Sequence, residues 1–382
     1  MTRGCPRTST DTVSYPVEVD YAYDRVDTAL FEPGYAARAG LSRGAGLDRW
    51  APLLPPLDAP GLGEGDTPLI ELAPGCYLKD EARNPTWSHK DRLNRCTTSA
   101  ALRSGAPGIV VASSGNHGAA AAAYAARAGL RCVVFTAVDT PPAVDAFLHA
   151  YGAVVLPVPI EHRWPLLRTV VERCGLHPVS NQTPTHTGHA FGPEGYKTIA
   201  YEIHAEIGAP AAVFVPTGYG ELLYGVWKGF AELRRLGVTA SVPQIFACEP
   251  AAGGPLAAAV RTGVPATEVE VGPTDAYGID CSVGGYRGVV ALRESGGRPL
   301  LLTDDEMRSA QRELASRGLW VELSAAAGLA GLRQVGDVAG PVVCVSTSSG
   351  FKDVGVGSRT SAPVEPEWDA VRRRLRAAGI EA

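Results

Sequence analysis

One lysine of the chain stands where a lysine can act as a covalent catalyst. Lys90 follows an extended segment, residues 77–81, and precedes an Ala-, Thr- and Leu-rich stretch, residues 93–102, that is typical of a helix. A lysine at this junction faces unpaired backbone N–H groups. Its ordinary pKa of about 10.4 keeps the amine protonated, whereas burial or a cationic neighbour lowers the pKa and makes it a nucleophile. Because a solvated lysine at a helix start is the commoner explanation of such a segment taken alone, Lys90 has to be judged with the rest of the chain.

Three further turns carry groups that suit parts of one ligand. Ser113, Ser114, Asn116 and His117 follow an apolar segment, and their hydroxyl and backbone N–H groups can hold a carboxylate. A second turn opens a helix and suits a phosphate, because its glycines let the backbone come close; it comprises Thr217, Gly218, Tyr219, Gly220, Glu221 and Leu222. The third, residues 347–353, begins at Thr347 and offers neutral hydroxyls before its closing Lys352-Asp353 pair. Each turn alone could be a simple cap, but with Lys90 they fit a ligand that has an aldehyde, a ring oxygen, a phosphate and a pyridine nitrogen.

The elements that must position these turns alternate between strands and helices. We expect strands at 109–113, 131–136, 153–158, 211–216, 244–248 and 341–346, and helices at 117–128, 141–150, 193–207, 221–236, 304–317 and 324–335. Such alternation predicts an α/β protein with parallel sheets covered on both faces. Ligands of parallel sheets bind at the carboxyl ends of the strands, which is where the turns lie.

Composition excludes several classes of protein. The chain has 382 residues and a net charge of −5, which favours two domains and offers no basic surface for nucleic acid. Its eight cysteines are widely spaced and never form C-x-x-C, so neither a metal site nor a disulfide scaffold is expected. No apolar run approaches the roughly 20 residues needed to cross a membrane. We therefore expect a soluble, cytoplasmic protein with a small-molecule substrate.

Here the chain resembles a known family, the fold-type-II pyridoxal-phosphate enzymes (tryptophan synthase β-like), which include threonine synthase, threonine and serine dehydratases and cysteine synthase. The likeness extends from about residue 63 to Asp353. It is strongest to threonine synthase, in the segment Asn84 to Arg92 around Lys90, in residues 194–198 with Glu202, and in the closing G-x-K-D at 350–353.

The resemblance implies two parallel-sheet α/β domains with pyridoxal 5'-phosphate in the cleft between them. It implies a large domain of residues 61–95 plus 193–355 and a small domain of residues 96–192, and a homodimer is its default assembly. Residues 1–60 are Pro- and Gly-rich and read as an arm that wraps the body or contacts a neighbouring subunit. Residues 356–382 form a tail that is Pro-rich and then basic, where we expect a solvated helix.

Specific roles follow from the resemblance. Lys90 would hold the cofactor as a Schiff base and act as base and acid at the substrate carbon. Asn116 would bind the ring oxygen, the turn from Thr217 to Leu222 the phosphate, and Thr347 the pyridine nitrogen. The substrate would be surrounded by Ser88, Ser113, Ser114, His117 and Trp87.

Several positions depart from the threonine synthase pattern. An arginine that usually helps to bind the phosphate of phosphohomoserine is replaced by Gly192, a loss for which Arg92, Lys197 or Arg287 could compensate. Trp87 replaces a glycine and His89 a phenylalanine. Because Glu221 brings a carboxylate beside a phosphate, we expect its side chain to face outward.

Three functions stay open from the sequence. The first is a threonine-synthase-like lyase or synthase that performs β/γ-elimination or replacement on an amino acid, in amino-acid biosynthesis or a specialised pathway. The second is a threonine/serine dehydratase, an ammonia-lyase that releases a 2-oxo acid. The third is a paralogue that binds the cofactor with little catalytic activity.

Overall fold

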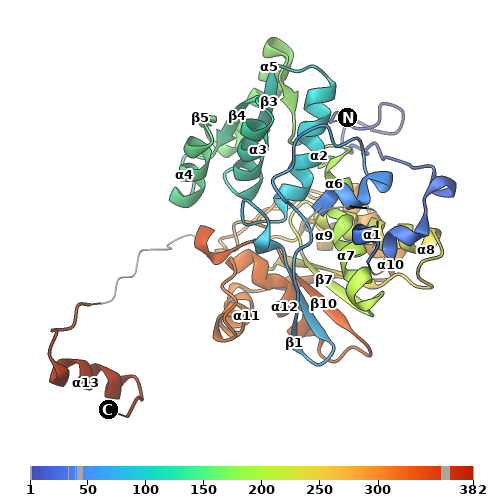
Figure 1. Cartoon of the computed structure of the whole chain (residues 1–382). Coiled ribbons are helices and arrows are strands. Elements are labelled where there is room, and N and C mark those ends of the chain that lie inside the picture. Colours follow the sequence, from blue (N-terminus) through green and yellow to red (C-terminus); the bar gives the residue numbers. More distant parts are fainter. Residues whose placement is uncertain (1, 33, 39, 41–45, 354–361, 382) are drawn as a thin grey trace.

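Two β-sheets, each covered by helices on both faces, form the body of the protein (Figure 1). The structure is a computed structural model, and it describes residues 2–32, 34–38, 40, 46–353 and 362–381. Strands within each sheet run parallel except for one edge pair. The predicted α/β fold class with parallel sheets is confirmed.

The larger sheet has six strands in the order β1-β2-β10-β7-β8-β9. Its edge strand β1 pairs antiparallel with β2 in a hairpin, which the predicted alternation did not include. The strands are β1 (Leu69–Ala73), β2 (Cys76–Asp80), β7 (Ala212–Pro216), β8 (Gln244–Pro250), β9 (Pro299–Leu302) and β10 (Val342–Ser346). In register, Val342 of β10 lies beside Cys76 on one side and Ala212 on the other, so three strands end at the same edge.

Alternating side chains of the central strand β7 enter two separate cores. Val213 and Val215 pack against one layer of helices, and Phe214 packs against the other. The first layer contains α6 (Gly192–Tyr196), α7 (Thr198–Ile207), α8 (Glu221–Arg235), α9 (Pro255–Thr262) and α10 (Tyr286–Ser295). The second contains α11 (Asp304–Ser316), η6 (Leu323–Ala326) and α12 (Ala327–Val335). Burial on both faces explains why this strand is a continuous apolar run rather than an alternating one.

The smaller sheet has four parallel strands in the order β5-β4-β3-β6. They are β3 (Gly108–Ala112), β4 (Arg131–Thr136), β5 (Val154–Pro157) and β6 (His177–Pro178). The helices around it are α2 (Lys90–Arg103), α3 (Asn116–Arg127), α4 (Pro142–Ala150) and α5 (Arg163–Cys174). Helix α2 runs through residue 95, where the sequence placed a domain boundary; the boundaries stay a prediction.

The N-terminal arm packs on the body of its own chain. Its short helices are η1 (Tyr23–Arg25), η2 (Thr28–Phe31), α1 (Tyr35–Arg38) and η3 (Gly46–Leu53). Trp50 is fully buried and stacks on Phe31 at a centroid distance of 5.6 Å, and both rings contact Tyr201 of α7. The arm therefore contributes to the large core. Two of its tyrosines also reach buried carboxylates: Tyr21 donates to Glu194 and Tyr23 to Glu232.

Close packing of α6 against α8 helps to position the glycine turn before α8 relative to the Lys90 turn before α2. A Cβ added at Gly225 of α8 would lie 2.5 Å from the Cβ of Tyr196, so only glycine allows this approach. Since α6 also packs on α2, the start of α8 is held beside the start of α2.

Within the described residues, no helix has the length and hydrophobicity needed to span a bilayer, and no group of His, Cys, Asp or Glu side chains is arranged to hold a metal ion. The tail contains helix α13 (Trp368–Ala377), none of whose residues is buried. The remaining short helices are η4 (Glu81–Arg83), η5 (Ile160–His162) and η7 (Gly350–Lys352).

Candidate active site

The candidate site lies at the carboxyl ends of β2, β10 and β7. Helix α2 begins at Lys90, and the residues just before it run beside the end of β10: Ser88 pairs with Ser348, and the backbone N–H of His89 donates to the carbonyl of Thr347 at 3.0 Å. The imidazole Nδ1 of His89 lies 3.1 Å from the same carbonyl. Thus the Lys90 segment and the Thr347 turn are joined by backbone pairing.

Lys90 is the one lysine of the described chain that has neither a hydrogen bond nor an ion pair on its Nζ. The chain has five lysines, and the other four are engaged: Lys79 with Glu202, Lys197 with Glu194 and Glu232, Lys228 with Glu194, and Lys352 with Asn116. The Nζ of Lys90 instead lies over the ring of Tyr196, 5.4 Å from its centroid.

Burial lowers the pKa of Lys90, while the Glu221 carboxylate opposes the shift and Cys281 adds a smaller opposing effect. A neutral fraction of the amine therefore exists at a lower pH than for a solvated lysine, which is the property that a nucleophilic lysine needs.

The serine loop after β3 is held by its own hydroxyls. Ser113 Oγ accepts from the N–H of Gly115 at 3.2 Å, and Ser114 Oγ accepts from the N–H of Ala137 at 2.6 Å. Ser114 Oγ also lies 3.3 Å from Nη1 of Arg163, at the start of α5. The loop thus has a guanidinium beside it that the sequence did not predict, and Nε of Arg163 is buried without a partner among the described residues.

Asn116 connects the two sheets through a buried polar network. Its amide nitrogen donates to Glu322 Oε2 at 2.9 Å, and its amide oxygen accepts from Lys352 Nζ at 2.8 Å and from Ser348 Oγ at 3.2 Å. Lys352 also donates to the carbonyl of Thr86. Burial lowers the pKa of Lys352 to about 8 and raises the pKa of Glu322. Neither residue was predicted for the site, although Lys352 lies in the G-x-K-D motif that marked the resemblance.

His117, which the resemblance places near the substrate, is held by contacts on both ring nitrogens. Its Nδ1 is 3.2 Å from the amide nitrogen of Asn94, and its Nε2 is 3.0 Å from the carbonyl of Val179. Burial, and secondarily the charge of Lys90, lowers the pKa of His117 to about 3. The imidazole is therefore neutral and links α2 to the segment after β6, because both ring nitrogens are already in use.

The glycine turn before α8 presents a row of free backbone donors. The N–H of Thr217 donates to Cys248, and its hydroxyl donates to Val215. In contrast, the N–H groups of residues 218–222 have no acceptor among the described residues. Gly220 has φ +88°, which a residue with a side chain rarely adopts. Successive free N–H groups at a helix start make a suitable site for a phosphate. The ring of Tyr219 stacks on His186, with centroids 4.2 Å apart.

The side chain of Glu221 faces inward, so the prediction that it faces outward is wrong. The side chain is only 12% exposed, and a Cβ at Gly188 would overlap its Oε1. A Cβ at Gly192 would lie 3.3 Å from the same oxygen. The carboxylate turns this way because two glycines of the 186–192 segment leave the room for it. Burial raises the pKa of Glu221, and Lys90 and Arg287 oppose the shift.

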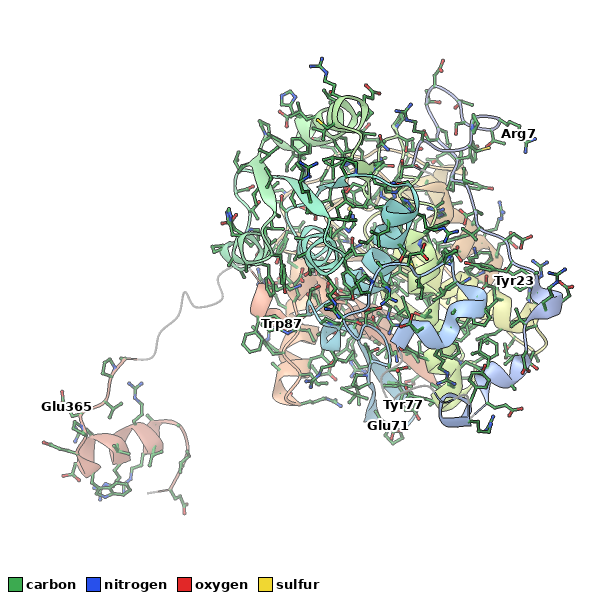
Figure 2. All side chains as sticks on the ribbon, turned by 45° about the horizontal axis from the view of Figure 1, so that its top comes forward. Arg7, Tyr23, Glu71, Tyr77, Trp87 and Glu365 are labelled. Atoms are coloured by element: carbon green, nitrogen blue, oxygen red, sulfur yellow. The ribbon has the colours of Figure 1, made fainter. Side chains whose placement is uncertain are left out.

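Trp87 lies at the rim of the site (Figure 2) and in an unusual backbone conformation. It is 43% exposed and has φ +63°, in the left-handed region. That value explains why a glycine suits this position. The indole packs edge-on against Phe147 of α4 at 5.5 Å and lies 6.1 Å from Phe351 of η7. Ser88, next in sequence, is fully buried, and its hydroxyl lies 3.4 Å from the N–H of Lys90.

The cations proposed to replace the missing arginine are engaged elsewhere. Arg92 is fully buried between Glu81 and Glu202, with nitrogen–oxygen distances of 2.6–2.8 Å. Arg287 binds Glu18 of the arm at 2.7 Å. Lys197, as noted, is paired with two glutamates. None of the three is free to take over a dianion near Gly192.

Comparison with known proteins agrees with this geometry. The sequence profile described as "Pyridoxal-phosphate dependent enzyme" matches residues 61–348. The threonine synthase of Methanosarcina acetivorans is 32% identical over 330 residues, which cover 80% of this chain and 80% of the relative. That of Halalkalibacterium halodurans is 33% identical over 329 residues, covering 78% and 86%. Among solved structures, maize serine racemase superposes with a TM-score of 0.65 at 19% identity, covering 82% of this chain and 93% of that chain, which shows the fold alone.

Proposed function

This chain belongs to the family of pyridoxal-phosphate-dependent enzymes, and we propose that it is a threonine-synthase-like enzyme that performs β- or γ-elimination or replacement on an amino acid. The observation that carries the proposal is Lys90, the one unpaired lysine among the described residues, with a lowered pKa at the start of α2.

The residues around Lys90 fit pyridoxal 5'-phosphate. The unpaired N–H groups of residues 218–222 suit its phosphate. The buried polar atoms that lack a hydrogen-bond partner in the described structure include Tyr196 Oη, Glu221 Oε1, Glu322 Oε1 and Ser346 Oγ. Buried polar groups are nearly always paired, so a polar ligand would supply partners that these atoms lack. When bound, the cofactor supplies an electron sink for the carbanion that forms at the substrate carbon.

Lys90 holds the cofactor and then moves protons. With its pKa lowered by burial, the amine serves as the base that removes the proton from the α-carbon of the substrate, and the resulting ammonium returns a proton to a substrate carbon or to the leaving group.

Thr347 would give the cofactor ring nitrogen a hydroxyl partner rather than a carboxylate. A hydroxyl leaves that nitrogen largely unprotonated, which favours elimination over transamination. The segment that carries it is fixed by the two contacts from His89.

The serine loop binds the carboxylate of the amino acid. Ser113, Ser114 and the N-terminus of α3 offer hydroxyl and N–H donors, and the Arg163 guanidinium next to Ser114 adds positive charge. Asn116 contacts the ring oxygen of the cofactor, and its orientation is set by Glu322 and Lys352.

A second candidate, an ammonia-lyase for serine or threonine, is favoured by one observation. The carboxylate of Glu221 occupies the space next to Gly192, and a carboxylate there disfavours a phosphorylated substrate. Incubation of the purified enzyme with phosphohomoserine, threonine, serine and phosphoserine separates the candidates: threonine formed from phosphohomoserine supports the synthase, and oxo-acid release from threonine or serine supports the lyase.

The role of Lys90 has a direct test, because only five lysines compete for the cofactor. Borohydride reduction of the holoenzyme followed by peptide mapping should place the pyridoxyl group on Lys90. Lys90→Ala should lose the reducible adduct, and Lys90→Arg, which keeps the positive charge, should lose it while retaining the fold. A pyridoxyl group found on any other lysine refutes the assignment.

A further inference from the structure

The carboxylate of Glu221 lies beside the reacting lysine without a direct partner for one of its oxygens. It is the first group that counteracts the lowering of the Lys90 pKa. Its Oε1 is buried and accepts no hydrogen bond from the described residues. A Cβ added at Gly192 would lie 3.3 Å from this oxygen and 3.1 Å from Cδ1 of Leu93. Leu93 lies one turn after Lys90 in α2. The unpartnered oxygen therefore points toward the space around the first turn of α2.

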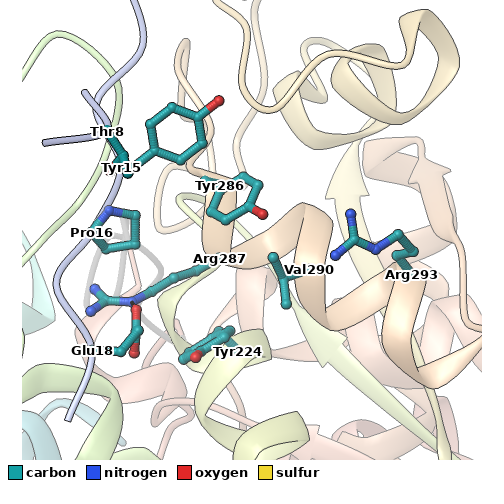
Figure 3. A pocket seen from close by; sticks show the side chains of 9 residues that line it. All are labelled: Thr8, Tyr15, Pro16, Glu18, Tyr224, Tyr286, Arg287, Val290 and Arg293. Carbon is teal, nitrogen blue, oxygen red and sulfur yellow. Dashed lines mark hydrogen bonds and ion pairs between the residues drawn. The ribbon is translucent and has the colours of Figure 1, made fainter. Parts of the chain in front are cut away.

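The neighbouring positive groups oppose the raised pKa of this carboxylate but donate no hydrogen bond to its Oε1. Arg287 Nη1 is 3.9 Å from Oε1 and donates to the carbonyl of Thr187, while the rest of the guanidinium donates to Glu18 at 2.7 Å and to the carbonyl of Val17 at 3.0 Å. Figure 3 shows Arg287 and Glu18 side by side at a surface groove of about 680 Å³ between the arm and α10. His186 is 4.0 Å from Oε2, and burial keeps its pKa well below the usual value, so it is neutral.

Charges on the two sides of the site therefore differ. Arg163 provides a cation next to the serine loop, whereas Glu221 provides an acid next to Gly192. An amino acid bound with its carboxylate at the serine loop directs its side chain elsewhere, and the acid at Glu221 is the ionisable group available to meet it. A phosphate dianion in that position would face a carboxylate, and an ammonium, amide or hydroxyl would find an acceptor.

We infer that Glu221 is a specificity-determining residue, which selects substrates whose side chain carries a hydrogen-bond donor or a positive charge and rejects those with a dianionic side chain. The inference rests on the proposed function. It concerns the group beyond the β-carbon of the amino acid and leaves the chemistry at Lys90 unchanged.

The test is spectroscopic binding to the holoenzyme, read from the change in cofactor absorbance. The probes are four-carbon amino acids whose side chains end in groups of different charge: L-2,4-diaminobutyrate, L-homoserine, L-aspartate and O-phospho-L-homoserine. Wild-type enzyme should bind the first two at least about tenfold more tightly than the last two, the size expected for one charge-assisted hydrogen bond. Glu221→Gln, which keeps the shape of the side chain, should reduce the preference for diaminobutyrate over aspartate by about tenfold.

Glu18→Gln is the matched control, because it removes the same charge from the far side of Arg287 and should leave the order of binding unchanged. Tighter binding of phosphohomoserine than of homoserine by the wild type overturns the inference. So does an unchanged order in Glu221→Gln, or an effect of that variant on cofactor affinity alone. If no probe alters the wild-type spectrum, the proposed function itself fails, which is a different result from binding without charge preference.

Discussion

Substituting Gly188 tests where the side chain of Glu221 lies. Gly188 has φ +57°, so alanine there incurs the left-handed backbone cost of about 1–2 kcal/mol. The added Cβ would also overlap Glu221 Oε1 and push the carboxylate away from the backbone N–H of His189. Losing a hydrogen bond to a charged group costs about 1.5–3 kcal/mol more. We expect Gly188→Ala to lower the free energy of unfolding by about 2.5–5 kcal/mol in the wild type.

The same substitution should cost only the backbone term in a Glu221→Ala background, which gives a coupling energy of about 1.5–3 kcal/mol in a double-mutant cycle. Urea unfolding of the cofactor-free protein measures all four variants without the stabilisation that a bound ligand adds. Gly175→Ala is the control, since Gly175 has φ +66° and nothing within 4 Å of its Cβ position. If Gly188→Ala costs the same in both backgrounds, the side chain of Glu221 is not at Gly188 and the specificity inference loses its basis.

Three further predictions concern the surroundings of Lys90. The free energy of unfolding in urea should be about 1–2 kcal/mol higher for Trp87→Gly than for Trp87→Ala. Both variants lose the contacts of the indole, but only glycine adopts φ +63° without backbone strain. Equal stabilities of the two variants contradict backbone strain at residue 87. His117, whose folded pKa is about 3, binds fewer protons than the unfolded chain between pH 3 and 6.5, so its contribution weakens as pH falls below 6.5. His117→Gln should therefore reduce the loss of stability between pH 7 and 5 by about 2 kcal/mol, and an unchanged pH profile refutes a neutral buried imidazole. Arg92→Met should destabilise the protein by about 3–5 kcal/mol, since it leaves Glu81 buried without a cation and removes one of the two cations that pair with Glu202; a change below about 1 kcal/mol in urea unfolding contradicts that network.

Regular elements that carry a strong apolar pattern could be predicted from the sequence. The strand expected at 131–136 is β4 with the same bounds, and the helix expected at 221–236 is α8 to within one residue. In each case local hydrophobicity and the surrounding turns determine the element. The elements that were missed, including β1, α5 and α10, are short, amphipathic or polar, so that their formation depends on what packs against them.

The residues of the site were predictable only where a local motif holds them. Lys90, Asn116 and the glycine turn lie before helices that follow strands of the two sheets, and parallel sheets place such turns at the carboxyl ends of their strands. Arg163 and His186 reach the same region from elements with no recognisable motif, and Glu322 stands where the family usually has a Glu-Pro pair, a position to which the sequence assigned no role in the site. The partners of His117 were unpredictable for a similar reason: Asn94 and Val179 lie 23 and 62 residues away and cannot be read from its neighbours.

Gly192 and Glu221 both depart from the threonine synthase pattern, and they seemed independent in the sequence. In the structure the two positions lie together and form one spatial change. A residue with a side chain at 192 would press on Leu93 and on Glu221 Oε1, and a residue with a side chain at 188 would overlap that oxygen. The inward carboxylate thus requires small residues at both positions, and a glycine at 192 in turn leaves space that a buried carboxylate fills. The effect on charge is twofold, because the site loses a guanidinium and gains an acid within the same few ångströms. A neutral replacement of the arginine would weaken recognition of a phosphate, whereas an acid in its place, under the specificity role proposed for Glu221, would reverse the sign of the charge that the substrate side chain meets.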